Sequence, residues 1–484
     1  MISGPSRTGE ARALSAPLLR VRDVLLRERD VRLRLPFRFG AATLTEATEA
    51  FARVRVTLKD GRSAWGQAAE MLAPKWFDKD PARSNAENAE QLRAALRLAR
   101  TLYTEGRIAH TAFGLFAESH HFQIAEGARH GLNPLVAGFG PALLDRAVLD
   151  ALASLHGMSF PEAIRANLPG IDPGHFLPEF AGFDVGAFLA RLRPAQRLHV
   201  RHTVGLVDPI TAADRAAPVG DGLPETLEEV VATYGHAYFK LKVAGDPVAD
   251  VARLIAIAGV LDRLPQPYHV TLDGNEQYES VEAVLELWSR MERAPALRRL
   301  VDSVLFIEQP IARKVALIAD VRALAAKRPV IIDESDGDFD AFPEARAAGY
   351  RGVSSKTCKG IYKSILNRAR CDVWNAAAGR PEFFMSGEDL TQQAGIALQH
   401  DLALVSLLGL THVEKNGHHY VNGMAGRPAG EQRRFLDAHP DLYAAGDPVR
   451  LRIERGQVTI RSLDCAGFAT AAEPDWESMR EMGP

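Results

Sequence analysis

Residues 304–310 read Val-Leu-Phe-Ile-Glu-Gln-Pro, and residues 330–335 read Val-Ile-Ile-Asp-Glu-Ser. Each segment begins with a short apolar run, which is typical of a strand buried on both faces of a parallel sheet. Each run then ends in a carboxylate, Glu308 in the first and Asp333 in the second. The carboxyl ends of parallel strands meet at one edge of a sheet, so the two acids are expected to lie close together.

Three more segments around this pair repeat the pattern of an apolar run that ends in charge. Five consecutive predicted strands therefore end in a charged side chain, which is the arrangement expected at the catalytic face of a (β/α)8 barrel. The three segments are Tyr238 to Val243, with Lys240 and Lys242; Tyr268 to Asp273; and Gly352 to Lys356.

From about Leu198 onward, short apolar strands alternate with helix-length segments. Eight such units over about 220 residues have the number and size of a (β/α)8 barrel, although a doubly wound sheet also alternates strands and helices. The charged strand ends favour the barrel. The other predicted strands are Leu198 to Val204, Val304 to Glu308, Val330 to Asp333, Phe383 to Ser386 and Thr411 to Glu414, and the predicted helices include Val251 to Leu261, Val281 to Met291, Val315 to Ala325 and Ile361 to Trp374.

The chain before Leu198 is predicted to form a smaller α+β unit. Apolar and polar residues alternate from Val31 to Leu35 and from Val54 to Leu58, and Asp60-Gly61 supplies a hairpin turn, so antiparallel strands are expected. Two helices follow, and Gly157 is expected at the C-terminal cap of the second. Their apolar positions are Leu92, Leu96, Ala99 and Tyr103 in the first, and Leu144, Val148, Leu152 and Leu155 in the second.

Composition excludes several classes of protein. The chain has 484 residues, and 58 Lys and Arg against 61 Asp and Glu give a formal net charge of −3, so a general nucleic-acid binder is not expected. No apolar run has the length of a membrane span, the first residues lack a secretory signal, and the three cysteines form no disulfide or metal-binding pattern. We expect a cytoplasmic protein, a homo-oligomer, without nucleic-acid or membrane partners.

The two lysines of the second predicted strand lie on one face of it. Strand alternation places Lys240 and Lys242 opposite Phe239, Leu241 and Val243. If the apolar face packs against the surrounding helices, both lysines point into the mouth of the barrel, where burial is costly unless function retains them. The alternative is an exposed edge strand with solvated lysines.

Three carboxylates from adjacent strands, Asp273, Glu308 and Asp333, would repel one another unless a cation lay between them. A site of hard oxygen ligands suits Mg²⁺. A single acid at a strand end is more often a loop or helix-capping residue, but three in succession are harder to explain in that way. Alternation directs Asn275 to the side of Asp273 and turns Glu334 away from Asp333, so Glu334 is expected to support the site or cap a helix.

Lysines on both flanks of such a metal suit proton transfer. A substrate carboxylate bound to Mg²⁺ has an acidified α-proton, because the metal stabilises the enediolate that forms when the proton leaves. A lysine base must be neutral part of the time, which requires a pKa depressed by burial, by a second ammonium and by the metal. Lys240 beside Lys242 would supply that effect, and Lys356 could return a proton to the opposite face. This arrangement suits racemisation or epimerisation.

The set of motifs resembles the enolase superfamily, specifically its muconate lactonizing enzyme and dipeptide epimerase branch within the mandelate racemase/muconate lactonizing enzyme family. The resemblance covers nearly the whole chain. The motifs are Lys240-Leu-Lys242, Asp273-Gly-Asn275, Ile307-Glu308-Gln309-Pro310, Asp333-Glu334-Ser335 and Lys356-Thr-Cys-Lys359-Gly360.

The resemblance implies a (β/α)8 barrel with an N-terminal α+β capping domain, Mg²⁺ as cofactor and a small-molecule carboxylate as substrate. It implies Asp273, Glu308 and Asp333 as metal ligands, and the pairing of lysine bases with Mg²⁺ is a known property of that superfamily. Lys242 and Lys356 would be the acid/base pair, Lys240 would tune Lys242 and contact the substrate, and Asn275 would support the metal strand. The expected organisation is a loose tail at 1–17, a capping domain at 18–197, the barrel at 198–425, and a C-terminal segment at 426–484 that returns to the capping domain.

Some residues depart from the branch. Its dipeptide epimerases carry an Asp-x-Asp pair on the eighth strand, where this chain has His412-Val-Glu414, so a dipeptide substrate is not implied. Glu414 matches an acid that other branches use to hydrogen-bond the enediolate, or it is a loop acid. The seventh strand lacks the histidine base of mandelate racemase, and His412, His418 and His419 are expected in a loop or interface. Lys359 is expected to cap the following helix.

The two loops of the capping domain that are expected to select the substrate are Phe37 to Thr45, with Gly40, and Glu70 to Asp78, with Trp76 and Phe77. The favoured reaction is racemisation or epimerisation. A cycloisomerase or an acid-sugar-type dehydratase would use the same enediolate and the same lysines. A barrel that has lost catalysis and only binds ligands is a third possibility.

Overall fold

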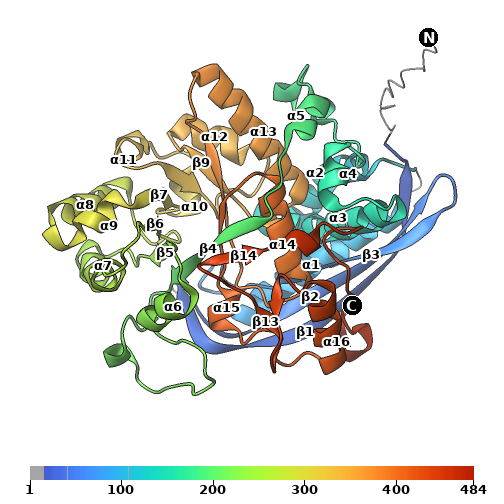
Figure 1. Cartoon of the computed structure of the whole chain (residues 1–484). Helices are drawn as coiled ribbons and strands as arrows, with labels where there is room; N and C mark the ends of the chain where they lie inside the picture. The colour runs from blue at the N-terminus through green and yellow to red at the C-terminus, as the bar shows by residue number, and fades with distance from the viewer. Residues whose placement is uncertain (1–15, 41, 107, 484) are drawn as a thin grey trace, which may run out of the picture.

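The barrel is closed in the computed structural model, which describes residues 16–40, 42–106 and 108–483. Eight parallel strands pair in chain order and the last pairs with the first, so the predicted (β/α)8 barrel is confirmed (Figure 1). All eight strands lie where they were predicted. They are β4 (Arg197–Val204), β5 (Tyr238–Lys242), β6 (His269–Asp273), β7 (Val304–Glu308), β8 (Val330–Ile332), β9 (Gly352–Ser355), β10 (Phe384–Gly387) and β11 (His412–Glu414).

Helices surround the strands on the outside of the barrel (Figure 1). Helix α8 (Val281–Arg293) illustrates why: Ser280 caps its first turn, and Val281, Val284, Leu287, Trp288 and Met291 form one buried stripe at helical spacing. The other helices from β4 onward are α6 (Leu227–Tyr234), α7 (Pro247–Leu261), α9 (Arg298–Asp302), α10 (Arg313–Ala316), α11 (Arg322–Ala325), α12 (Ala341–Ala348), α13 (Ile361–Ala378), α14 (Ile396–Leu407), α15 (Gly417–Tyr420) and α16 (Ala429–Ala438).

The helix predicted from Val315 to Ala325 is wrong. The structure has two short helices there, α10 and α11, with a break between them. The Asp320 carboxylate accepts a hydrogen bond from the Arg322 backbone N–H at 2.9 Å, and the Val321 N–H donates to the Ala348 carbonyl instead of continuing the first helix. Asp side chains compete in this way with helical hydrogen bonds, which apolar spacing alone does not reveal.

An antiparallel sheet covers one end of the barrel. Strands β1 (Leu19–Phe39), β2 (Ala42–Leu58) and β3 (Ser63–Met71) form a meander, and the predicted turn at Asp60-Gly61 joins the last two. In Figure 1 the long strands β1 and β2 sweep beneath the barrel. The C-terminal strand β15 (Arg480–Glu481) pairs with β1, whereas β14 (Gln457–Thr459) pairs with barrel strand β4. Strands β12 (Tyr443–Ala444) and β13 (Arg450–Leu451) form a separate hairpin.

Helices α1 (Asn85–Glu105) and α3 (Pro134–Leu155) confirm the two predicted helical stretches, and Gly157 follows the C-terminal cap of α3 in a left-handed conformation. Helix α2 (Ala112–Arg129) was missed, because polar residues interrupt its apolar spacing. The short helices α4 (Phe160–Arg165) and α5 (Val185–Arg191) lead into the barrel. Of the predicted tail at 1–17, residues 1–15 lie outside the described residues.

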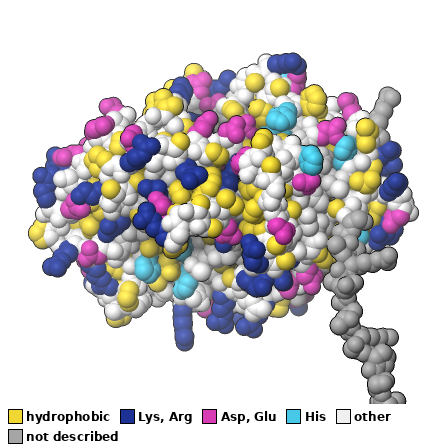
Figure 2. All heavy atoms as spheres, turned by 90° about the horizontal axis from the view of Figure 1, so that it is seen from above, with side chains coloured by type: hydrophobic (Ala, Val, Ile, Leu, Met, Phe, Trp, Pro, Cys, Tyr) yellow, Lys and Arg dark blue, Asp and Glu magenta, His cyan; other side chains and the backbone are white. Residues whose placement is uncertain are grey.

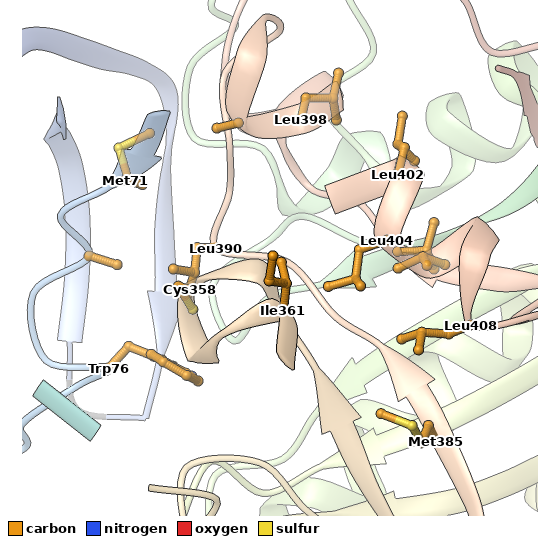
Figure 3. Close-up of a cluster of buried hydrophobic side chains, with 14 of the residues drawn as sticks. Met71, Trp76, Cys358, Ile361, Met385, Leu390, Leu398, Leu402, Leu404 and Leu408 are labelled. Atoms are coloured by element: carbon orange, nitrogen blue, oxygen red, sulfur yellow. The ribbon is translucent and has the colours of Figure 1, made fainter. Parts of the chain in front are cut away.

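Apolar side chains join the sheet to the barrel. In Figure 3, Met71 and Trp76 lie opposite Cys358, Ile361 and Leu390, and all five are buried. A polar contact reinforces this interface: the Glu70 carboxylate accepts hydrogen bonds from Thr357 at 3.0 Å and from Gln392 at 3.0 Å, and pairs with Arg146 at 3.1 Å. The cap is therefore fixed to the barrel next to the ends of β9 and β10.

The surface carries both charges. On the face drawn in Figure 2, Lys and Arg side chains are interspersed with Asp and Glu side chains. Among the described residues, no helix combines the length and apolar character that crossing a bilayer requires.

One buried acid in the cap predicts a pH-dependent stability. Asp145 lies inside the helical layer, where the Tyr103 hydroxyl donates to it at 2.7 Å, and burial raises the pKa of Asp145 from 3.8 to about 8. The folded protein therefore binds one more proton than the unfolded chain between these pH values. Stability from this group is complete below about pH 4 and is lost as the pH rises toward 8, by at most about 1.4 kcal/mol per pH unit.

The Asp145→Asn variant removes this titration. Its melting temperature is expected to rise relative to wild type, more at pH 8.5 than at pH 5.5, in thermal unfolding followed by circular dichroism. Asp302→Asn, at an exposed position, is the control and should show the wild-type pH dependence. A variant that is equally destabilised at both pH values would mean that the folded state needs the Asp145 charge.

Candidate active site

The C-terminal ends of the barrel strands bring the predicted lysines and acids together. Lys240 and Lys242 are 1 % and 6 % exposed, and Phe239 and Leu241 on the opposite face are fully buried. The alternative of an exposed edge strand with solvated lysines is therefore wrong. Both lysines point inward, because their ammonium groups contact acids from other barrel strands.

Four carboxylates surround the Lys240 ammonium. Its Nζ lies 2.9 Å from Asp273 Oδ2, 2.8 Å from Glu308 Oε2, 2.8 Å from Glu388 Oε2 and 2.9 Å from Glu414 Oε2. An ammonium group has three N–H donors, so it cannot give each of the four a hydrogen bond. Negative charge at the centre of the barrel therefore exceeds what Lys240 alone can satisfy.

Lys242 and Lys356 lie on the two flanks of this cluster. Lys242 Nζ lies 2.6 Å from Asp273 Oδ2 and 2.7 Å from Asn275 Oδ1, on the side of β5 and β6. Lys356 Nζ lies 2.5 Å from Asp333 Oδ2, on the side of β8 and β9. Each predicted base is thus paired with a predicted metal ligand.

Asp333 has further partners. The Lys359 ammonium lies 3.5 Å from Asp333 Oδ1 and donates to Ser354 Oγ at 2.7 Å, and the Ser354 hydroxyl in turn donates to Asp333. The prediction that Lys359 caps a helix is therefore wrong, since its side chain turns back toward β8 and β9. Lys356 and Lys359 lower the pKa of Asp333 below its usual value, against the opposing effect of burial.

Glu388 and Glu414 complete the cluster, and Glu388 had no role in the sequence prediction. Glu388, directly after β10, pairs with Arg201 of β4 and with Lys240. Strand alternation would have directed Arg201 inward, and a buried arginine inside a barrel requires an acid. Glu414 is buried on β11 and accepts a hydrogen bond from Thr203 at 2.7 Å, so it is part of the site and not a loop acid.

The remaining predicted residues support the strand ends. Glu334 accepts hydrogen bonds from Lys79 at 2.9 Å and from Asn275 at 3.1 Å, so it links the cap to the barrel and does not cap a helix. Gln309, which received no role from the sequence, accepts from the Asp333 backbone N–H at 2.9 Å and donates to Ser335 at 2.8 Å. Asn275 and Gln309 both have positive φ, 40° and 33°, which is strained for residues other than glycine and is common at functional sites.

The cap closes the mouth of the barrel over these groups. Trp76 is 5 % exposed, and its ring lies 4.5 Å from the Lys356 ammonium. The segment predicted as a loop from Phe37 to Thr45 is instead the strand ends of β1 and β2, and Phe37 and Phe39 face the site. Gly40, directly after β1, has a φ of 52°, a left-handed conformation that favours glycine, and a Cβ there would lie 2.8 Å from the end of the Gln277 side chain.

The cavity between these groups is small. It measures about 30 Å³, which is room for about two water molecules, so a substrate requires the lining side chains or the cap segments to move apart. Arg313 holds the Trp76 segment by donating to the Trp76 and Phe77 carbonyls, both at 2.8 Å. The cavity is lined by Phe37, Phe39, Leu44, Ala73, Trp76, Lys240, Lys242, Asp273, Asn275, Asp333, Lys356, Asp389, Leu390, Thr391, Glu414 and Asn416.

The donor set fits a hard divalent cation. Asp273 and Glu308 are cross-strand neighbours, and Asp333 ends the next strand. Burial, and then repulsion from Asp273 and Glu388, raise the pKa of Glu308 well above its usual value. A buried acid held in this way between other acids is the environment that a cation with oxygen ligands stabilises.

The surrounding acids dominate the pKa of Lys240 and that of Lys356. Burial alone would lower the pKa of Lys240, but the four surrounding carboxylates outweigh it and raise the pKa well above its usual value. Burial would also lower the pKa of Lys356, but Asp333 raises it. Of the four acids around Lys240, only Glu388 had no role in the sequence prediction.

The histidines near β11 do not form one group. His412 lies on β11 and contacts Arg201, whereas His418 and His419 lie in the short helix α15, on the outer side of the barrel wall. The expectation of a single loop cluster is therefore wrong. His418 instead lies beside His202 and His236.

A (β/α)8 barrel with an antiparallel α+β cap, whose mouth holds lysines and acids from successive strands, defines a cap-and-barrel protein of the enolase type. Residues 222–384 match the family model described as enolase C-terminal domain-like. This central part of the barrel therefore matches the family that the sequence motifs resemble, which confirms the resemblance. No curated protein matches this sequence.

Solved structures share the architecture over the whole chain. A dipeptide epimerase from Enterococcus faecalis V583, complexed with Mg and the dipeptide L-Leu-L-Tyr, has 14 % identity and a TM-score of 0.59, and covers 93 % of this chain and 99 % of its own. The 2-chloromuconate cycloisomerase of Rhodococcus opacus 1CP has 17 % identity, a TM-score of 0.57, and coverage of 95 % and 98 %. The muconate lactonizing enzyme of Pseudomonas fluorescens has 17 % identity, a TM-score of 0.56, and coverage of 95 % and 97 %. At these identities the likeness shows the fold.

Proposed function

We propose that this protein is a Mg²⁺-dependent racemase or epimerase that acts at the carbon α to a substrate carboxylate. The observation that carries the proposal is the placement of Lys242 and Lys356. Both line one cavity, and each is paired with an acid on its own flank, Asp273 or Asp333. A proton can therefore be removed on one side of a substrate and returned on the other.

The chain's own groups divide the remaining work. Asp273, Glu308 and Asp333 would hold the metal, with Asn275, Gln309 and Glu334 fixing the strand ends that carry them. When bound, Mg²⁺ supplies positive charge that stabilises the negative charge developing on the substrate carboxylate as the α-proton leaves.

Two charged side chains and three aromatic rings would bind and enclose the substrate. Lys240 holds Glu308, Glu388 and Glu414 in place and offers its charge to a substrate carboxylate. Glu414, anchored by Thr203, is positioned to contact the same group. The rings of Phe37, Phe39 and Trp76 exclude water and fill the space where substrate side chains would lie. The proposed substrate is a small-molecule carboxylate. We further propose that the protein is a homo-oligomer in the cytoplasm.

Solvent exchange tests the proposal. The protein is incubated with Mg²⁺ in deuterium oxide with a library of amino-acid derivatives and hydroxy acids, and deuterium at the α-carbon is measured by mass spectrometry and NMR. At least one compound is expected to exchange its α-hydrogen, and a chelator should abolish the exchange. If no compound in the library exchanges, the proposal fails.

A cycloisomerase or an acid-sugar-type dehydratase remains the second candidate. A chloromuconate cycloisomerase and a muconate lactonizing enzyme share the fold, and lysines on two flanks of a cavity serve either outcome. Product mass identifies dehydration, which loses a water molecule. Racemisation and cycloisomerisation both leave the mass unchanged apart from deuterium, and NMR of the product distinguishes a new ring from an inverted centre. A non-catalytic binding barrel would show neither, and failure to bind Mg²⁺ in calorimetry would favour it.

A further inference from the structure

Three histidines meet on the outer side of the barrel wall, away from the carboxylate cluster. On β4, Arg201 and Thr203 point into the barrel, so alternation turns His202 outward. His236 lies between α6 and β5, and His418 lies in α15. Three separate segments of the chain thus supply one imidazole each.

The ring nitrogens are close enough to share one ion. One nitrogen from each histidine lies within 4.8 Å of the other two, and His202 Nδ1 lies 3.3 Å from His418 Nε2. Tetrahedral Zn²⁺ with bonds of about 2.0–2.1 Å places its nitrogen ligands about 3.3–3.4 Å apart. His202 and His418 already have this spacing, and the nitrogen of His236 would have to move inward by about 1.4 Å at most.

Two of the imidazoles are fully buried, and His202 and His418 lie within hydrogen-bond distance of each other while His236 has no such partner in the described part of the chain. His202 and His236 are 2 % and 0 % exposed, and neither ring nitrogen of His236 makes a hydrogen bond of good geometry to any of the described residues. Buried polar groups without partners are rare unless an ion or a water satisfies them. Burial lowers the pKa of His418 to about 3 and that of His202 and His236 well below 6.5, and neutral imidazole is the form that binds metals.

Backbone carbonyls also act on the pKa of two of the rings. The Val200 carbonyl favours a proton on the ring of His236, and the Lys415 carbonyl does so for His418, each partly opposing the larger effect of burial on the pKa. A histidine that ligates a metal commonly directs its other N–H to a carbonyl or carboxylate, which fixes the tautomer and the ring orientation.

A cavity gives access from solvent. It measures about 770 Å³, and His418 and Tyr234 line it together with Glu229 and Glu454. His418 is only partly buried, so an ion held by the three rings would have a fourth position open to this cavity. Three histidines with one open position form a recognised type of zinc site.

We propose that His202, His236 and His418 bind one transition-metal dication of the Zn²⁺ type, at a site separate from the carboxylate cluster. Nitrogen ligands select Zn²⁺ over Mg²⁺, which prefers oxygen, so the two sites would not compete for the same metal. The ion would tie β4 to α15. Strand β4 carries Thr203, and α15 directly follows Glu414 of β11. The side chains of Thr203 and Glu414 contact each other in the candidate active site. The zinc site would thereby hold β11 in register with β4.

Cobalt spectroscopy tests the site in the full-length protein. The protein is stripped with a chelator and dialysed into excess Mg²⁺, which occupies oxygen sites, and Co²⁺ is then added. One equivalent is expected to bind with the strong visible absorption of four-coordinate nitrogen ligation, and one equivalent of Zn²⁺ should displace it and raise the melting temperature. No such absorption in the wild-type protein would overturn the proposal.

Variants assign the ligands. His418→Gln, at the partly exposed position, is expected to weaken Co²⁺ binding at least tenfold, and His236→Asn should do the same. His199→Gln, on the same strand but bonded to Gln457, and Glu308→Gln, in the carboxylate cluster, should bind Co²⁺ as the wild type does. Undiminished binding in both His418→Gln and His236→Asn would overturn the proposal and leave the histidines as packed neutral rings.

Discussion

The Glu308→Gln variant is expected to lose Mg²⁺ binding while folding at least as stably as the wild type. Glu308 is fully buried, and burial together with Asp273 and Glu388 raises its pKa well above its usual value. Glutamine has the shape of the protonated acid and cannot carry a repulsive negative charge. The substitution should therefore keep or raise the free energy of unfolding while it lowers the Mg²⁺ affinity. Activity should fall about 1000-fold or more, because a catalytic metal contributes several kcal/mol to the transition state.

Calorimetric Mg²⁺ titration and thermal unfolding measure the two effects. Glu431→Gln is the matched control, since Glu431 is equally buried but pairs with Arg29 at 2.8 Å and Arg427 at 3.0 Å, and the Arg29 and Arg427 guanidiniums lower its pKa against burial. It should keep Mg²⁺ binding and lose about 3–5 kcal/mol of stability. Wild-type Mg²⁺ affinity in Glu308→Gln would remove Glu308 from the ligand set.

The sequence predicted the barrel because each strand carries its own signal. The runs that end in Asp273, Glu308 and Asp333 are apolar, short and closed by one charge, and the structure places all three acids at adjacent strand ends. These are local patterns, and the repeating geometry of the barrel converts them into a shared site. The residues of one strand end could therefore be assigned without knowing the others.

Contacts across the barrel could not be predicted in the same way. Lys240 meets Glu388 and Glu414, which are 148 and 174 residues away in the sequence. The run before Glu388 is short and contains Ser386 and Gly387, so it does not resemble a buried strand that ends in a catalytic acid. Because Glu388 has no sequence signal of its own, the full set of acids that raises the pKa of Lys240 could not be named from the sequence.

Reciprocal lysine variants should separate the two halves of the proposed reaction. Lys356→Ala is expected to exchange the α-hydrogen of one stereoisomer only, and Lys242→Ala that of the other, because each lysine faces the substrate from its own flank. Racemisation should fall about 10²- to 10⁴-fold in both. Neither variant leaves a buried acid unpaired, since Asp333 keeps Lys359 and Asp273 keeps Lys240.

Deuterium incorporation into each separate stereoisomer, followed by NMR, measures how much the exchange rates of the two stereoisomers differ in each variant. Lys356→Arg is the control for charge: it keeps a cation beside Asp333 and Trp76, yet a guanidinium does not act as a base at ordinary pH, so it should behave as Lys356→Ala does. Recovery of exchange in Lys356→Arg would mean that the position supplies charge and not a proton. Loss from both stereoisomers in one alanine variant, with no loss in the other, would contradict a base on each face and would favour a mechanism in which one lysine transfers every proton.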